Sequence, residues 1–159
     1  MDLAAQLRAF RPWNEQEERD REALLRLLEN GQAPYGREDP AHLTASAWVV
    51  SPGRDRGLLA YHNLYDSWSW LGGHADGERD LLSAALREVR EESGLEEVRP
   101  VSRDIYSVEI LTVDGHEKRG RYVSSHLHLN VTFLLEADPA APVRRKADEN
   151  SAVAWFALE

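Results

Sequence analysis

Three glutamates near the middle of the chain have a spacing that would concentrate carboxylates on one side of a helix. Glu88, Glu91 and Glu92 lie three and four positions apart, and residues at those separations are neighbours on a helical surface. Like charges so placed repel, and the macrodipole disfavours anions in the last turn of a helix. A divalent cation between the carboxylates would remove both penalties. The spacing therefore predicts a site for Mg²⁺, Mn²⁺ or Ca²⁺, which prefer oxygen ligands.

The residues around the glutamates are compatible with such a site. Arg87 offers a counter-charge that can hold one glutamate in a fixed rotamer. Gly72 and Gly73 precede the helix and permit close backbone approach, so a carbonyl of this pair is a candidate ligand. A solvated helix end in an acidic protein is the alternative interpretation of the glutamates taken alone.

The elements that must position these residues can be predicted from local patterns. Apolar residues recur at helical spacing between Asp80 and Ser93, and Gly94 is a favourable helix terminator, which predicts a helix over 80–93. Strand patterns occur on both sides of this helix. They cover residues 44–50, 58–62, 68–71, 105–113, 126–134 and 153–156. One helix between several strands predicts an α+β or α/β/α layered domain with a mixed sheet.

Residues 1–40 are predicted to form a helical extension packed on a main domain over 41–159. Asn14 and Glu17 have the spacing of a capping box, and Gly31 is a plausible C-terminal stop. The leucines at 24, 25, 27 and 28 supply an apolar stripe that we expect to lean on the main domain.

The composition limits the possible partners. The chain has 159 residues, with 19 Lys and Arg against 28 Asp and Glu, and a formal net charge of −9. This length suits one core, and the acidic balance argues against binding to a nucleic-acid duplex, which calls for a basic surface. A polyphosphate substrate stays compatible if a divalent cation lies between the two acidic partners.

The absence of cysteine narrows the chemistry further. Without it the chain has neither disulfides nor thiolate ligands, so oxygen or imidazole must bind any metal. No apolar run approaches the roughly 20 residues needed to cross a bilayer, and residues 1–13 do not resemble a secretory signal. We therefore expect a cytoplasmic protein without membrane contact.

The segment from Gly72 to Leu95 resembles the Nudix box, the pattern Gly-x5-Glu-x7-Arg-Glu-U-x-Glu-Glu-x-Gly-U, in which U is a large aliphatic residue. The positions that match in register are Gly73, Arg87, Glu88, Val89, Glu91, Glu92, Gly94 and Leu95. The Gly-Gly-His-Ala-Asp-Gly opening at residues 72–77 resembles a bacterial subgroup of the family, often with a downstream His-Leu-His such as residues 126–128. The overall resemblance covers roughly residues 43–158.

One position departs from the box. Arg79 stands where the pattern has glutamate. We interpret the change as tolerated, with Glu78 or Asp76 as candidates to supply the missing carboxylate. Weakened metal binding is the alternative.

The resemblance implies a Nudix α/β/α sandwich with a mixed sheet, to which the N-terminal helix is added. It also implies a hydrolase of a pyrophosphate bond in a nucleoside diphosphate linked to another moiety, a small molecule, with Mg²⁺ or Mn²⁺ as cofactor. By the family match, Glu91 and Glu92 are the best metal ligands, Glu88 is a ligand or base and Arg87 belongs to the catalytic core. The carbonyl of Gly72 is a further ligand. Nudix domains often dimerise, so the N-terminal helix is a candidate homodimer interface.

Further site candidates each have a structural alternative. Glu149 has the chain position of a family general base, or is an exposed loop carboxylate. His126 and His128 share one face of a strand and could contact a phosphate or sugar, or pack within the fold. His74 could bind substrate or lie in a turn, and Trp70 could stack on a base or belong to the core.

Two other functions compete with hydrolysis. A Nudix-fold module that binds or senses a nucleotide with little or no catalysis is suggested by Arg79, whereas the intact Glu88, Glu91 and Glu92 count against it. Isomerase chemistry on an isoprenyl diphosphate occurs in the same fold but uses an essential cysteine, which this chain lacks.

Overall fold

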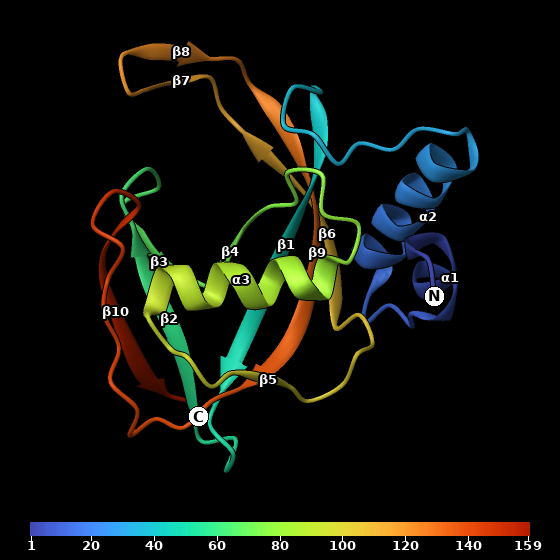
Figure 1. The fold of residues 1–159 in the computed structure, drawn as a ribbon. Helices are drawn as coiled ribbons and strands as arrows, with labels where there is room; N and C mark the ends of the chain where they lie inside the picture. The colour runs from blue at the N-terminus through green and yellow to red at the C-terminus, as the bar shows by residue number, and fades with distance from the viewer.

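The computed structural model describes residues 1–159 and contains one large, curled, mixed β-sheet (Figure 1). Five strands follow one another across the sheet in the order β10-β2-β1-β9-β5, and three more pair onto this path, β3 on β2, β4 on β1 and β6 on β9. The bounds are β1 Ala41–Val50, β2 Arg56–His62, β3 Ser67–Ser69, β4 Leu71–His74, β5 Arg99–Pro100, β6 Ser107–Val113, β9 His126–Glu136 and β10 Asn150–Ala157. Only β1 and β9 run parallel.

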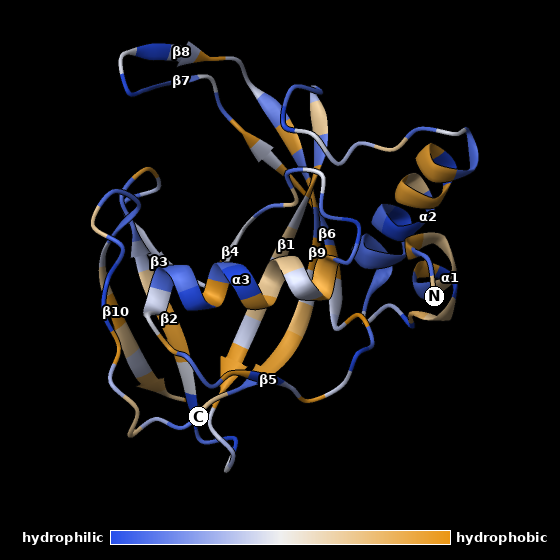
Figure 2. Cartoon of the chain, viewed as in Figure 1, coloured by the Kyte–Doolittle hydropathy of each residue, from blue (hydrophilic) through white to orange (hydrophobic).

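Helix α3, Leu81–Ser93, crosses one face of this sheet (Figure 1). The Asp80 side chain accepts a hydrogen bond from the Ser83 backbone N–H at its start, and Gly94 ends it in the left-handed conformation, with φ of 72°. Its buried residues include Leu82, Ala85 and Val89, which are spaced to form one apolar face. Figure 2 shows the complementary pattern, with apolar residues along the central strands and mixed polarity on α3. The expected α+β fold with a mixed sheet and helices is confirmed.

The N-terminal segment forms two helices, α1 Leu3–Ala9 and α2 Glu15–Glu29, rather than the single helix expected. Pro12 lies in the break between them, where it cannot donate a backbone hydrogen bond. The predicted capping interaction is present, since Asn14 Oδ1 accepts from the Glu17 N–H at 2.9 Å. Both helices contribute buried residues to the same apolar cluster as the sheet.

Two acidic side chains of α2 cover the free edge of β6. Glu17 Oε1 accepts from the Val108 N–H at 3.4 Å, and Asp20 Oδ2 accepts from the Ile110 N–H at 3.0 Å. An uncovered edge strand would leave these donors open to pairing with another chain. The helical extension therefore completes the hydrogen bonding of the sheet as well as its apolar core.

The segment before α3 differs from expectation. The single strand predicted over 68–71 is two strands, β3 and β4, and β4 continues through Gly72 and Gly73 to His74. A Cβ on Gly72 would collide with the backbone of β1, so this close pairing depends on glycine. Beyond the sheet, β7 His116–Lys118 and β8 Arg121–Val123 form a separate hairpin. None of the helices has the length and hydrophobicity required to span a membrane.

Glu17→Ala should destabilise the fold, because it removes the acceptor for Val108 and also the one for the Trp13 N–H, which Glu17 Oε2 accepts at 2.6 Å. We expect a loss of about 1–3 kcal/mol in the free energy of unfolding, measured by urea denaturation. Glu18→Ala, on the exposed face of the same helix, is the matched control. Equal stability of the two variants would contradict this role for Glu17.

Candidate metal and substrate site

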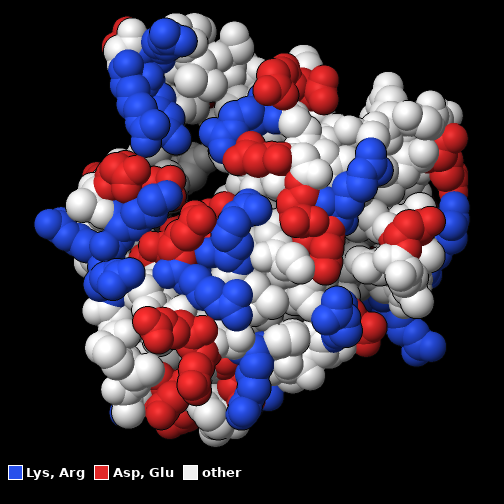
Figure 3. All heavy atoms as spheres, in the orientation of Figure 1, with Lys and Arg blue, Asp and Glu red and all other residues white.

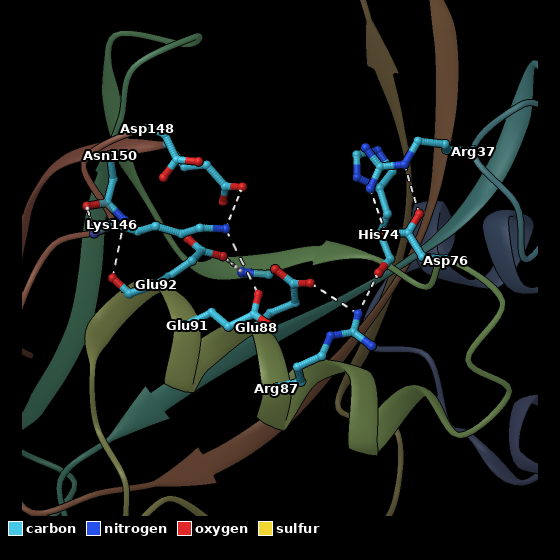
Figure 4. A network of polar contacts seen from close by, with 12 residues as sticks. Arg37, His74, Asp76, Arg87, Glu88, Glu91, Glu92, Lys146, Asp148 and Asn150 are labelled. Atoms are coloured by element: carbon cyan, nitrogen blue, oxygen red, sulfur yellow. Dashed lines mark hydrogen bonds and ion pairs between the residues drawn. The ribbon is translucent and has the colours of Figure 1, made fainter.

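Three carboxylates meet where the C-terminal half of α3 faces β4 and the loop before β10. Glu88, Glu92 and Glu149 each place a carboxylate oxygen within 4.8 Å of those of the other two. Glu88 and Glu92 are buried, with 9% and 4% of their surface exposed. Figure 4 shows Glu88 and Glu92 rising from the helix toward the strand above it. The predicted helix face and the predicted late-loop glutamate therefore meet in space.

Hydrogen bonds fix the two helical glutamates. Glu92 Oε1 accepts from the Gly72 N–H at 3.0 Å. Arg87 Nη2 donates to Glu88 Oε1 at 3.1 Å and to the His74 carbonyl at 3.0 Å (Figure 4). Arg87 therefore holds the Glu88 rotamer, as its position in the sequence predicts, and also ties the helix to the end of β4.

The loop that carries Glu149 is attached to the end of α3. Asn150 Nδ2 donates to the Glu92 carbonyl at 3.3 Å, and Asn150 Oδ1 accepts from the Lys146 N–H at 3.1 Å. Asn150 is itself buried, with 1% of its surface exposed. This buried amide brings Glu149 beside the helix, although the two lie far apart in the sequence.

The glycine pair allows the carboxylates to approach the strand. A Cβ on Gly73 would occupy the position of the Glu88 carboxylate, and one on Gly72 would meet Ser46 and the backbone of Ala45. Any larger residue at 73 would push Glu88 away from the cluster. The close backbone approach that the sequence suggested is therefore used by Glu88.

The two buried glutamates of the cluster have raised pKa values. Burial raises the pKa of Glu92 to about 8, against the lowering effect of the Gly72 N–H, and the nearby charges of Glu88 and Glu149 raise it further. Burial also raises the pKa of Glu88, opposed by its hydrogen bond from Arg87. Each negative charge at this position is therefore costly when no cation is bound.

A lysine supplies a positive charge at the edge of the cluster. Lys146 Nζ donates to Glu149 Oε1 at 2.9 Å and lies 4.0 Å from Glu91 Oε2. Glu91 is exposed and lies outside the three-carboxylate cluster. Glu91, which the family resemblance placed among the best metal ligands, therefore points toward Lys146 in this structure.

The donor set suits a hard divalent cation. It consists of three carboxylates whose oxygens gather at the end of a helix, and the pKa values of the two buried ones, Glu88 and Glu92, are raised. Mg²⁺ and Mn²⁺ prefer such ligands. Glu88, Glu92 and Glu149 are the residues that could hold the ion, with Glu91 available if its side chain rotates away from Lys146.

The predicted substitutes for the missing box glutamate have other partners. Asp76 pairs with Arg37, with Nε to Oδ1 at 2.8 Å, and Glu78 Oε1 accepts from the Asp80 N–H at 2.9 Å. Arg79 lies over the ring of Tyr35, 5.2 Å from its centre. Neither Asp76 nor Glu78 belongs to the carboxylate cluster.

The predicted histidines form a second group beside the first. His74 on β4 and His126 and His128 on β9 approach one another, and His42 of β1 joins them. Trp70, between β3 and β4, lies instead near Trp48, with ring centres 6.0 Å apart. Trp70 belongs to neither group.

Three contributors to the site were missed in the sequence. His42 stands just before the segment predicted as a strand, and Lys146 and Arg37 lie in loops. A strand begun three residues earlier, at Ala41, would have placed His42 on the same face as Thr44. No local signal marks Lys146 or Arg37, because their partners come from distant parts of the chain.

The surface around the site carries both charges. Figure 3 shows acidic and basic side chains interleaved over α3, with basic groups on the β7–β8 hairpin. Arg119 of this hairpin lies 3.3 Å from Asp148, beside Glu149. A cleft of about 900 Å³ lies elsewhere, between the end of α3 and residues 136–144, and contains none of the three clustered carboxylates.

A comparison with models of protein families identifies the family of this chain. The NUDIX domain model matches residues 40–159. The chain belongs to the Nudix family. Nudix hydrolases act on phosphoric anhydrides and generally use divalent metals, and the glutamates of the box are those found on α3. The comparison with curated proteins gave no match.

Solved structures share the Nudix fold. The E. coli dihydroneopterin triphosphate pyrophosphohydrolase is 17% identical, with a TM-score of 0.53, over 78% of this chain and 83% of that one. A C. elegans Ap4A hydrolase is 19% identical, with a TM-score of 0.47, over 72% and 79% of the two chains. A MutT Nudix hydrolase from Burkholderia pseudomallei is 22% identical, with a TM-score of 0.46, over 74% and 83%. At 17% identity and a TM-score of 0.53, the likeness to the E. coli enzyme concerns the fold alone.

The raised pKa of Glu92 gives this Nudix domain a distinct dependence of stability on pH when metal is removed. Folded Glu92 keeps its proton up to about pH 8, whereas the ordinary value is 4.5. Between these values the folded state binds one more proton than the unfolded state, so the free energy of unfolding falls as pH rises. Glu92→Gln keeps an acceptor for Gly72 and removes this titration.

With EDTA present, Glu92→Gln should therefore be more stable than the parent at about pH 9, by on the order of 2–4 kcal/mol, and equally stable at about pH 4. Urea unfolding at the two pH values measures the difference. A variant that is no more stable at the higher pH would show that Glu92 is not buried as described.

Proposed function

We propose that this Nudix protein is a metal-dependent hydrolase that cleaves a pyrophosphate bond in a nucleoside diphosphate linked to another moiety. The observation that carries the proposal is the burial of Glu88 and Glu92 beside Glu149, with carboxylate oxygens within 4.8 Å of one another. Such a group of acids is costly in the absence of a cation. It lies on the helix that carries the Nudix box, where a purely structural role would not call for it.

Some residues of the site would bind the metal ion, and others would position those ligands. Glu88 and Glu92 would hold Mg²⁺ or Mn²⁺, together with the carbonyl of Gly72. Glu91, whose Oε2 lies 4.0 Å from Lys146 Nζ, would be a further ligand after its side chain rotates. Arg87 keeps Glu88 in place through the hydrogen bond at 3.1 Å.

The bound cation would neutralise charge on the phosphate oxygens and lower the pKa of an attacking water. Glu149 is the candidate base, because its carboxylate reaches the cluster from a separate loop. Lys146 Nζ donates to Glu149 Oε1 at 2.9 Å and so holds that carboxylate in position beside the cluster.

The rest of the substrate would extend from the carboxylates along β4. His74 lies two residues beyond Gly72 on this strand, roughly 7 Å along the chain direction. That distance suits contacts of His74, and of His126 and His128 beside it, with the part of the substrate beyond the cleaved bond. Trp70, on the other side of Gly72, is the candidate for stacking on a base.

Hydrolysis should be detected with Mg²⁺ or Mn²⁺ and a panel of ADP-ribose, NADH, dinucleoside polyphosphates, nucleotide sugars and nucleoside triphosphates. Phosphate released after phosphatase treatment is the measurement. Glu92→Gln should lower kcat by at least about 100-fold, because it removes a ligand to the charge-stabilising ion. Glu97→Gln, an exposed glutamate just beyond the helix, should leave kcat unchanged.

The departure at Arg79 favours a second candidate function, a module that binds a nucleotide without cleaving it. Arg79 lies over Tyr35, and no other carboxylate joins Glu88, Glu92 and Glu149. Saturable binding of a panel member without product, with both metals, would replace the hydrolase proposal by this one.

A further inference from the structure

Four of the six histidines in the chain meet at one end of the sheet, next to the carboxylate cluster. His42 of β1 and His128 of β9 are directly paired in the parallel ladder, and His74 of β4 pairs with Thr44 on the other side of β1. His126 precedes His128 by two residues and so lies on the same face. The ring centre of His42 is 5.1 Å from His74, 4.9 Å from His126 and 5.1 Å from His128.

His42 has a buried nitrogen without a partner. Its Nδ1 lies 2.8 Å from the Asp39 carbonyl, which can only accept, so Nδ1 carries the proton and Nε2 presents a lone pair. His42 is 2% exposed, and Nε2 makes no hydrogen bond. An unpaired buried polar atom costs about 1–3 kcal/mol. A hydrogen bond through one ring nitrogen, with the other left free, is the usual arrangement of a metal-binding histidine.

The remaining rings offer the same chemistry. His126 Nδ1 lies 2.8 Å from the Ser124 carbonyl, and its Nε2 is 3.2 Å from His128 Nε2. Burial lowers the pKa of His74 to about 4 and that of His128 to about 3, with Arg37 and the neighbouring histidines acting in the same direction. The burial of His74 and His128 favours the neutral form of imidazole, which is the form that binds metals.

The charged side chains beside the histidines are compatible with the binding of a cation. Arg37, whose charge lowers the pKa of both rings, pairs with Asp76 through hydrogen bonds of 2.8 and 2.5 Å. Figure 4 shows this pair directly beside His74. Asp76 therefore offsets the positive charge of Arg37 beside the rings.

We propose that His42, His74 and His128 form a second metal site, which takes a divalent transition metal, with Zn²⁺ the expected ion. Each of the three places a ring nitrogen within 4.8 Å of the other two. Zinc holds imidazole nitrogens at about 2.0–2.1 Å, which separates tetrahedral ligands by roughly 3.4 Å. Small rotations of partly exposed His74 and His128 toward buried His42 would close the site.

The two clusters would select different ions. The carboxylates suit Mg²⁺ or Mn²⁺, whereas a site made only of imidazoles suits zinc and its transition-metal neighbours. Three protein ligands leave the fourth zinc position for water or an anion. Arg87 connects the clusters, since it donates to the His74 carbonyl and to Glu88. The zinc site shares His74 and His128 with the proposed substrate contacts, but its test measures bound metal and needs no hydrolysis.

The test is zinc binding to the full chain in excess Mg²⁺, which occupies the carboxylate site. After treatment with a chelator, incubation with Zn²⁺ and gel filtration, elemental analysis should find about one zinc per chain. Loss of a hydrogen bond to a metal ligand lowers metal affinity about 10–100-fold. Loss of the ligand itself costs more, so His74→Gln and His128→Gln should each lower the zinc affinity at least about 100-fold. Titration with Co²⁺ should give the visible spectrum of a four-coordinate ion.

Two variants separate this site from the carboxylates and from imidazole in general. Glu92→Gln and His62→Gln, the latter on β2 outside the cluster, should retain zinc. Circular dichroism and thermal unfolding establish that each variant is folded, and His74 is chosen because it is only half-buried. Absence of bound zinc in the parent, zinc retained by His74→Gln and His128→Gln, or zinc lost in Glu92→Gln would each overturn the proposal.

Discussion

The burial of two glutamates against a glycine-glycine strand is the constraint on which the rest of this structure depends. Glu92 accepts from the Gly72 N–H, and Glu88 occupies space that any side chain at residue 73 would fill. A carboxylate taken out of water needs compensation. The sheet register, the end of α3 and the Asn150 loop all hold oxygens in that position, and the compensation that we propose is a bound cation.

The rest of the fold keeps this arrangement rigid. Parallel pairing of β1 with β9 brings His42 beside His128, and β4 on the other side of β1 brings in both the glycines and His74. The N-terminal helices protect the far side by covering β6 with Glu17 and Asp20. An acidic chain thus uses its carboxylates in two ways, as acceptors for an open strand edge and as candidate ligands.

Local sequence patterns predicted the helix that carries the glutamates and several helix ends. Helical spacing located the three glutamates, and Asn14, Asp80 and Gly94 marked helix ends that the structure confirms. The pairing of distant strands could not be predicted in this way, because no sequence pattern near His42 indicates the parallel register between β1 and β9. The same limit applies to Lys146, whose contact with Glu91 depends on how a distant loop folds back. The presence of Glu149 rather than Glu91 beside Glu88 and Glu92 depends on a loop and on rotamers that spacing does not encode.

The most direct measurement of the central claim is a crystal structure of the protein soaked with Mn²⁺, with anomalous diffraction to locate the ion. The account predicts an anomalous peak between Glu88 and Glu92, within coordination distance of both carboxylates, with Lys146 displaced from Glu91. A Mn²⁺-soaked crystal without a peak at these residues, and with Lys146 still beside Glu91 and Glu149, would contradict it.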